Sequence, residues 1–174
     1  MEAPTPVSAL LHAATIVTAG AYLLLRNHEL LGSAPNSILI IASVGLITSC
    51  FAGLSGLSRH DIKSVIAFST ISQVAFIVLG CGLGEFNSAI YLLFTHAFYK
   101  ALLFTGAGIV IHSIGGNQDL RLIGGLGRSL PLTSAAMLIA SASLGAIPFT
   151  SGDFSKDILI ELGGGSRLIL NDAL

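Results

Sequence analysis

Lys100 and His96 are the residues of this sequence best suited to chemistry, because both can carry a proton within a strongly apolar stretch. Residues 88–112 contain no carboxylate, and Lys100 stands at their midpoint, four positions after His96. This spacing stacks the two side chains on one face of a helix. They cannot both be charged there at low cost, so a proton arriving on one favours release from the other. The pair therefore predicts proton transfer inside a helix.

The position of Lys100 within the stretch makes its charge costly. Its Cα lies roughly 18 Å along the helix from either end, too far for the methylene chain to carry the ammonium to the lipid headgroups. A charge at the centre of a membrane span costs at least about 2.5–3.5 kcal/mol on insertion scales, so such residues are interpreted first as functional.

The composition indicates an integral membrane protein. Apolar residues make up 53% of the chain, charged residues 10%, and the mean hydropathy is +0.86, whereas a soluble domain has about 25% charged residues. The net charge of -1 and the lack of basic runs argue against nucleic-acid binding. Cys50 and Cys81 have no partners at metal-ligand spacing. No phosphate loop or nucleophile motif is present, so we expect no catalytic residue, cofactor or metal in this chain.

Five apolar runs of membrane length predict an all-α, polytopic helical bundle. They cover residues 6–25, 37–57, 62–83, 88–112 and 130–147. No linker divides them, so residues 1–174 are expected to form a single membrane domain. The basic residues Arg59, Lys63, Arg121 and Arg128 flank the second-to-third and fourth-to-fifth connections, which should share one side. Loops on the inner side collect such residues, so the chain is expected to begin there.

The sequence after the fifth run allows two interpretations. In the first, a span over residues 130–162 breaks near 148–155, at Pro148 and Gly152, and Lys156 is buried beside Asp157. In the second, the span ends at Ile147 and an exposed tail follows. Broken helices survive in lipid only where protein or a water-filled cavity satisfies their backbone, and they mark ion pathways. Composition leaves both interpretations open.

Two further runs contain polar residues. His12, in the first run, suits either an interhelical hydrogen bond or a proton carrier. The third run places polar residues on one helical face, namely Lys63, Thr70 and Gln73, with Ser69 beside them. Such a face can hold a file of waters. Lys63 also stands at a helix end, where its ammonium can instead reach the membrane–water interface or pair with Asp61.

Four segments resemble, in order and spacing, the antiporter-like subunits of respiratory complex I. They are MEAPTPVSALLHAAT at 1–15, DIKSVIAFST at 61–70, THAFYKALLF at 95–104 and FSKD at 154–157. The resemblance covers nearly the whole chain and is strongest to the distal subunit group, subunit 5. The connector at 112–121 looks like the mitochondrial type, and Thr18 stands where the related Mrp-type sodium/proton antiporter subunit has a lysine.

The resemblance implies a proton-translocating fragment of the membrane arm, in the mitochondrial inner membrane or, alternatively, a bacterial plasma membrane. NADH-to-ubiquinone electron transfer would take place in other subunits, which hold flavin, iron–sulfur clusters and ubiquinone. Partners would be other membrane-arm subunits and lipids such as cardiolipin. By resemblance, the proton-translocation residues are His12 between half-channels, Lys63 as connecting lysine, His96 and Lys100 in the central relay, and Lys156 of the broken helix with its neighbour Asp157.

Three departures from the family pattern qualify this expectation. Leu92 fills a position where the family often has a second histidine, and Asp153 replaces an aromatic residue and could pair with Lys156. The upstream helices with the family's input ion pair are absent, so we expect a split subunit whose missing helices lie on a separate polypeptide. Alternatives are an Mrp-type antiporter subunit and a structural remnant that conducts no protons.

Overall fold

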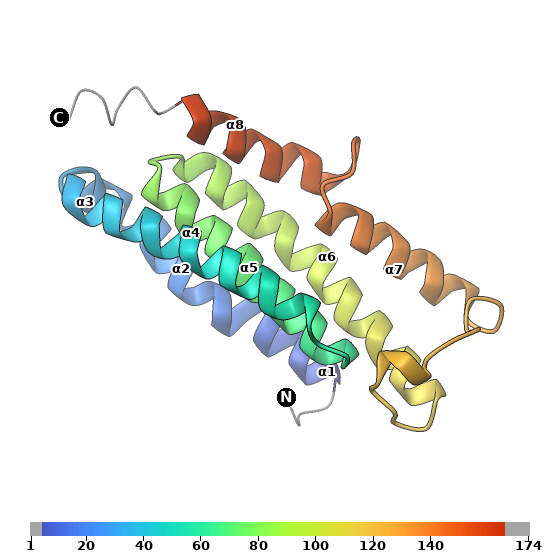
Figure 1. The fold of residues 1–174 in the computed structure, drawn as a ribbon. Helices are drawn as coiled ribbons and strands as arrows, with labels where there is room; N and C mark the ends of the chain where they lie inside the picture. The colour runs from blue at the N-terminus through green and yellow to red at the C-terminus, as the bar shows by residue number, and fades with distance from the viewer. Residues whose placement is uncertain (1–4, 166–174) are drawn as a thin grey trace.

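The computed structural model describes residues 5–165, without the side chains of residues 6, 12–14 and 163–165. Within that range the regular elements are all helical, and the long ones lie side by side in an elongated bundle (Figure 1). They are α1 (Thr5–Ser8), the π-helical η1 (Ala9–Thr15), α2 (Ile16–Arg26), α3 (His28–Gly32), α4 (Pro35–Leu57), α5 (Ile62–Gly82), α6 (Phe86–Ser113), the 3₁₀ helix η2 (Leu120–Leu122), α7 (Pro131–Leu144), the π-helical η3 (Asp153–Asp157) and α8 (Ile158–Gly165).

Four of the described helical segments are long and apolar enough to cross a membrane: Ala9–Arg26, Pro35–Leu57, Ile62–Gly82 and Phe86–Ser113. The shorter helix α7 is also apolar. These segments confirm the predicted all-α membrane bundle. The connection between the first two predicted runs contains the short helix α3.

A turn at residues 145–150 ends the fifth apolar run and separates α7 from the helix that follows. Ala146 and Phe149 have positive φ angles of 54° and 69°, and Phe149 donates its backbone N–H to Asp153 Oδ2 at 2.9 Å. Helical structure resumes at residue 151, and α7 and α8 lie end to end along one side of α6 (Figure 1). The predicted broken helix is therefore confirmed, but its break begins earlier than residue 148.

Gly152 has a different role from the one expected at a helix break. It lies inside the resumed helix with φ -72° and ψ -35°, whereas Pro148 lies in the turn. A Cβ atom at residue 152 would overlap the carbonyl oxygen of Ser143 at the end of α7. Glycine is therefore needed for the close approach of the two half-helices, and the interruption itself lies upstream.

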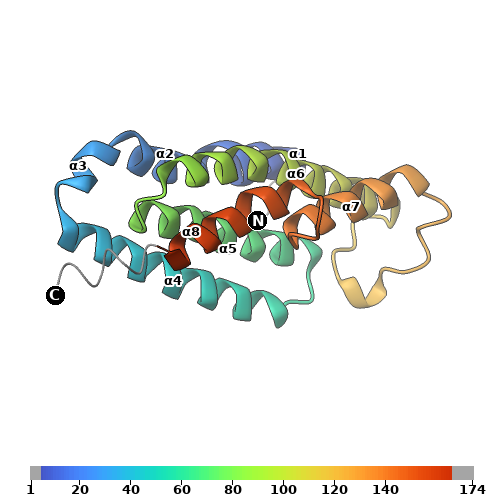
Figure 2. The same cartoon turned by 90° about the horizontal axis from the view of Figure 1, so that it is seen from above.

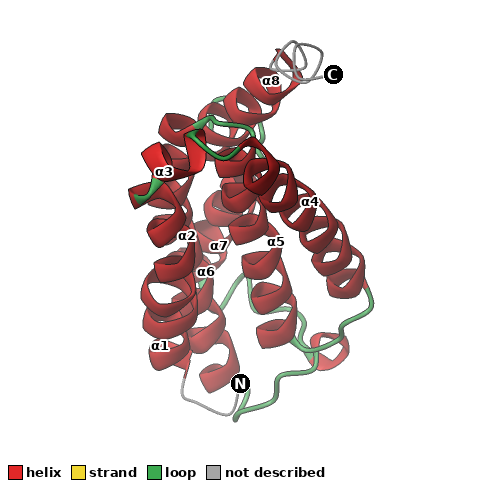
Figure 3. Cartoon of the chain, turned by 90° about the vertical axis from the view of Figure 1, so that its left-hand side faces the viewer, coloured by secondary structure: helices red, strands yellow, loops and turns green. Residues whose placement is uncertain are grey.

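Small residues bring α4 and α5 together, as is usual between membrane helices. A Cβ on Gly45 would lie 2.7 Å from the backbone nitrogen of Leu79, and one on Gly82 would lie 2.6 Å from Cα of Ala42. Helix α4 packs mainly on α5, and Figures 2 and 3 show α4 and α2 on opposite sides of α5. The outer face of α4 exposes large apolar side chains, as expected for a lipid-facing or subunit-facing surface.

Helices α5 and α6 run antiparallel and enclose two apolar clusters. One cluster includes Ile62 and Ile66 of α5 with Tyr99, Leu103 and Phe104 of α6. The other includes Ile77 and Cys81 of α5, Ala89 and Leu92 of α6, and Leu159 of α8. The polar residues at 69–73 and 95–100 lie between the two clusters along both helices. A polar layer thus crosses the bundle between two apolar layers.

The connection before α5 and the connection after α6 meet at one end of the bundle. Leu120 donates its backbone N–H to the carbonyl oxygen of His60 at 2.8 Å, and Ile62 donates to that of Gln118 at 3.0 Å. These bonds confirm that the α4–α5 and α6–α7 connections share one side.

Candidate functional site

Lys100 is the central group of the polar layer. Its side chain is fully buried, at 0% exposure. Its Nζ donates to Ser69 Oγ at 2.6 Å and to the carbonyl oxygen of Ile66 at 3.4 Å. In the described part of the chain the one ion pair joins Arg121 and Asp119, in the α6–α7 connection. A buried ammonium is therefore held by neutral oxygen atoms of α5, an arrangement that leaves its charge uncompensated within these residues.

His96 lies one turn before Lys100 and is also fully buried. Its ring contacts Tyr99 edge-on, with centroids 5.6 Å apart. Both ring nitrogens lack a hydrogen-bond partner among the described residues, as does Oε1 of the buried Gln73. The antiparallel register that pairs Lys100 with Ser69 places His96 level with Gln73. Orphaned polar atoms gathered at one level indicate a site that needs additional hydrogen-bonding partners, such as water.

Lys156 approaches this layer from the broken helix. Its Nζ lies 5.2 Å from the ring centroid of Phe76 in α5, at cation–π distance, and its charge interacts with that of Lys100. Leu159, one turn later, is fully buried against Gly80 and Ala89. The exposed-tail interpretation is therefore wrong, because the chain after the break packs against α5 and α6.

The carboxylates near Lys156 are arranged differently from the expectation. Asp153 Oδ2 accepts the backbone N–H of Phe149 and so stabilises the turn; it forms no ion pair with Lys156 among the described residues. Asp157 is exposed, and its charge interacts with that of Lys156. Asp153 therefore acts on the turn.

A contact that the sequence did not predict joins α6 to η3. Thr95 Oγ1 donates to Ser155 Oγ at 3.2 Å, and both residues are buried. Ser155 Oγ in turn donates to the carbonyl oxygen of Ser151 at 2.9 Å. Serine and threonine are common in membrane helices, so only the three-dimensional position of the half-helix reveals this pair.

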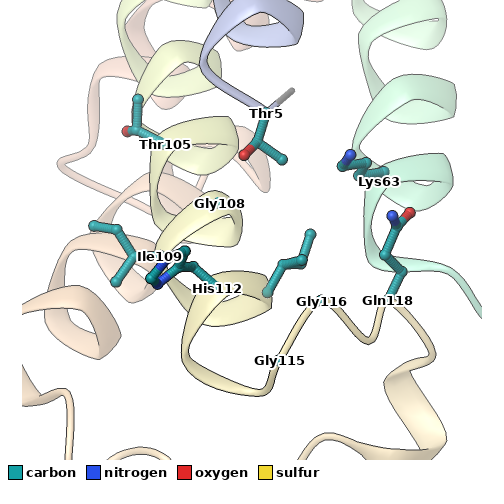
Figure 4. A pocket seen from close by; sticks show the side chains of 10 residues that line it. Thr5, Lys63, Thr105, Gly108, Ile109, His112, Gly115, Gly116 and Gln118 are labelled. Carbon is teal, nitrogen blue, oxygen red and sulfur yellow. The ribbon is translucent and has the colours of Figure 1, made fainter. Parts of the chain in front are cut away.

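Lys63 lies away from the polar layer, at the start of α5. It is buried and lines a cavity of about 1030 Å³ together with His112 of α6 and Gln118 of the following connection (Figure 4). The polar face predicted for α5 is present, since Thr70 and Gln73 are buried like Lys63. The sequence did not predict that His112 would share a cavity with Lys63.

Two further predicted positions have distinct outcomes. His12 belongs to η1, but its side chain lies outside the part that the structure describes. Leu92 is fully buried in the apolar cluster with Ile77 and Leu159. The position where the resemblance implies a second histidine thus belongs to an apolar cluster.

Comparison with known proteins places this geometry in a family. The family model described as NADH:quinone oxidoreductase/Mrp antiporter, TM, matches residues 1–170. The chain is 54% identical over 165 residues to NADH-ubiquinone oxidoreductase chain 5 of Talaromyces marneffei, and 53% identical over 169 residues to that of Trichophyton rubrum. These alignments cover 95% and 97% of the chain but 25% and 26% of the relatives. The chain therefore spans about a quarter of the length of these relatives.

A solved structure is also similar. The structure of the Mrp complex from a Dietzia species contains a chain that superposes with a TM-score of 0.84 at 37% sequence identity. The superposition covers 92% of this chain and 18% of that one. With 170 of its 174 residues inside the family model, the chain belongs to the NADH:quinone oxidoreductase/Mrp antiporter family of membrane proteins.

Proposed function

We propose that this chain forms the middle of the proton pathway in an antiporter-like membrane-arm subunit of respiratory complex I, the proton-translocating NADH:ubiquinone reductase. The observation that carries the proposal is the fully buried Lys100, bound by neutral oxygens one turn from the fully buried His96. Buried ionisable groups in membrane helices are retained where they conduct ions or protons. The identity above 50% to chain 5 of NADH-ubiquinone oxidoreductase supports this subunit type.

The contacts of Lys100 suit a group that alternates between two charge states. As an ammonium it donates to Ser69 Oγ and to the carbonyl oxygen of Ile66. As a neutral amine it can accept the hydroxyl proton of Ser69, because a serine hydroxyl both donates and accepts. The same two residues thus stabilise the loaded and the unloaded state. A proton on Lys100 disfavours one on His96 or Lys156, so a charge change at one position is passed to the others.

The remaining residues extend the path in both directions. Lys63, at the cavity shared with His112, would exchange protons with the end of the bundle where the two connections meet. Lys156, with Asp157 beside it, would carry protons from the polar layer along the broken helix. His12 would join this chain to the half-channel formed by the family's other helices.

The chemistry that drives transport would take place in other subunits. Flavin, iron–sulfur clusters and ubiquinone are proposed to reside there, in a complex of the mitochondrial inner membrane. Neighbouring membrane-arm subunits and lipids such as cardiolipin would cover the exposed apolar faces. That the family's other helices lie on a separate polypeptide stays a prediction. Denaturing electrophoresis with mass spectrometry of the assembled complex would distinguish it from one long polypeptide.

Replacing Lys100 with alanine tests the proposal. In the assembled complex, Lys100→Ala should lower the number of protons translocated per NADH oxidised, measured in sealed proteoliposomes. Arg128→Ala, which removes an exposed positive charge outside the bundle, is the matched control. An unchanged ratio in Lys100→Ala would refute the relay and favour a structural subunit that conducts no protons.

A second candidate is a subunit of an Mrp-type sodium/proton antiporter, favoured by the 37% identity and TM-score of 0.84 to a chain of the Mrp complex. Co-purification separates the two candidates. Complex I predicts flavin and iron–sulfur subunits in the purified assembly, whereas the antiporter predicts sodium-dependent proton flux in vesicles without NADH.

A further inference from the structure

A hydrogen bond between side chains links the polar layer of α6 to η3 of the broken helix. Among the described hydrogen bonds, the one from Thr95 Oγ1 to Ser155 Oγ alone joins side chains of α6 and η3. Thr95 directly precedes His96, and Ser155 directly precedes Lys156. The contact therefore joins the helical turn of the fully buried His96 to the helical turn of the half-buried Lys156.

The hydroxyl proton of Thr95 has several acceptors at similar distance. Its Oγ1 lies 3.2 Å from Ser155 Oγ, and also 3.2 Å from the carbonyl oxygens of Tyr91 and Leu92. One hydroxyl has a single proton, so these three bonds are alternatives. Rotation of the hydroxyl between the partner helix and its own backbone thus exchanges one hydrogen bond for another of similar length.

Ser155 has the same property on the other side. Its hydroxyl accepts from Thr95 and has two acceptors in its own helix, the carbonyl oxygens of Ser151 at 2.9 Å and Gly152 at 3.3 Å. Its side chain is fully buried, as is that of Leu159 four residues later. Two rotatable hydroxyls in contact form a short chain that can pass a proton.

We infer that the Thr95–Ser155 hydroxyl pair is the proton bridge between the His96–Lys100 pair of α6 and Lys156 of the broken helix, an inference that rests on the proposed function. Thr95 receives a proton from the His96–Lys100 pair by way of a water bound to the His96 ring nitrogens, which have no partner among the described residues, and gives its own hydroxyl proton to Ser155. Ser155 gives its hydroxyl proton toward Lys156. One proton enters and one leaves, and rotation of both hydroxyls restores the starting state without any redox step.

Isosteric substitutions in the assembled complex test the bridge. Thr95→Val keeps the shape of the side chain and removes the hydroxyl, and Ser155→Ala does the same on η3. Both should lower the protons translocated per NADH oxidised toward the ratio found for Lys100→Ala, whereas Thr95→Ser should restore it. Thr48→Val and Ser43→Ala are the controls, because these exposed α4 hydroxyls bond only to carbonyls of their own helix.

The ratio separates conduction from stability. A variant that only lowers the amount of folded complex reduces proton transport and NADH oxidation together, so its ratio stays at the wild-type value. The double variant Thr95→Val, Ser155→Ala should be no worse than either single variant, because both remove the same step.

Two outcomes are distinguishable. If Thr95→Val and Ser155→Ala both keep the wild-type ratio while Lys100→Ala lowers it, the bridge is refuted and the proposed function stands. If Lys100→Ala also keeps the wild-type ratio, the proposed function fails, and the inference fails with it.

Discussion

Lys100 Nζ lies 2.6 Å from Ser69 Oγ, so a cation at the centre of α6 is bound by a neutral hydroxyl of α5. The contact couples two helices through a group whose hydrogen bond can reverse direction. It also fixes the antiparallel register that places Gln73 at the level of His96. The polar layer is therefore set by the packing of α5 on α6.

Ser69→Ala removes the nearer of the two acceptors of Lys100. Hydrogen bonds to charged groups contribute about 1.5–3 kcal/mol, so the ammonium form should be less populated. We expect fewer protons to be translocated per NADH oxidised, measured in proteoliposomes. Ser43→Ala, on the exposed face of α4, should leave the ratio unchanged. Unaltered pumping in Ser69→Ala would show that Ile66 and other partners suffice.

Leu92→His introduces the residue that the resemblance implies for this position, one turn before His96. Here the position is fully buried in the apolar cluster of Ile77, Ala89 and Leu159, so the imidazole would take the place of apolar packing. Burying an unpaired polar group costs about 1–3 kcal/mol. We expect less assembled complex on native gels and no gain in pumping. Normal assembly with increased pumping would indicate that the relay can still use this site.

Gly82→Ala should separate α4 from α5. The new Cβ would lie 2.6 Å from Cα of Ala42, so the backbone of α4 or α5 must move. Overpacking of this kind costs about 1–3 kcal/mol, which thermal denaturation of the complex should detect. Gly53→Ala is the control, because no atom lies within 4 Å of its added Cβ. Equal stability of the two variants would contradict the close helix contact.

The α6–α7 connection should keep its structure in mild acid. Three hydrogen bonds from the Arg121 guanidinium to the carboxylate of Asp119, at 2.7 Å for the closest pair of atoms, lower the pKa of Asp119 to about 2. Its ordinary value in an unfolded chain is about 3.9. A lowered carboxyl pKa stabilises the folded connection above about pH 4 and loses that effect as pH falls toward 2.

The rate of cleavage by pepsin, a protease that is active in acid, can report this loss of stability. Cleavage near Leu120 should increase between about pH 4 and pH 2 in the wild type, following the ordinary and lowered pKa values of Asp119. In Arg121→Ala, cleavage should already be increased at about pH 4. Arg128→Ala should behave like the wild type. Identical pH profiles for Arg121→Ala and the wild type would rule out a role for this ion pair.

The sequence predicted much of the polar layer, because periodicity alone places His96 and Lys100 on one face and charge in an apolar run is rare. It also predicted a broken helix, since Pro148 and the polar residues after it interrupt an apolar pattern. The exact turn could not be predicted, because it depends on the close approach of Gly152 to Ser143. The Thr95–Ser155 contact joins residues sixty positions apart, and such pairing follows from tertiary packing alone.

The hydrogen bonds between the two connections have a mechanical consequence. Leu120 bonds to His60 and Gln118 bonds to Ile62, at the start of α5, where Lys63 begins the polar face. The segment that follows α6 and leads to α7 is thus fastened to the start of α5. Because of these bonds, a displacement of residues 118–120 would move the end of the helix that contains Lys63, at the edge of the cavity that Lys63 lines.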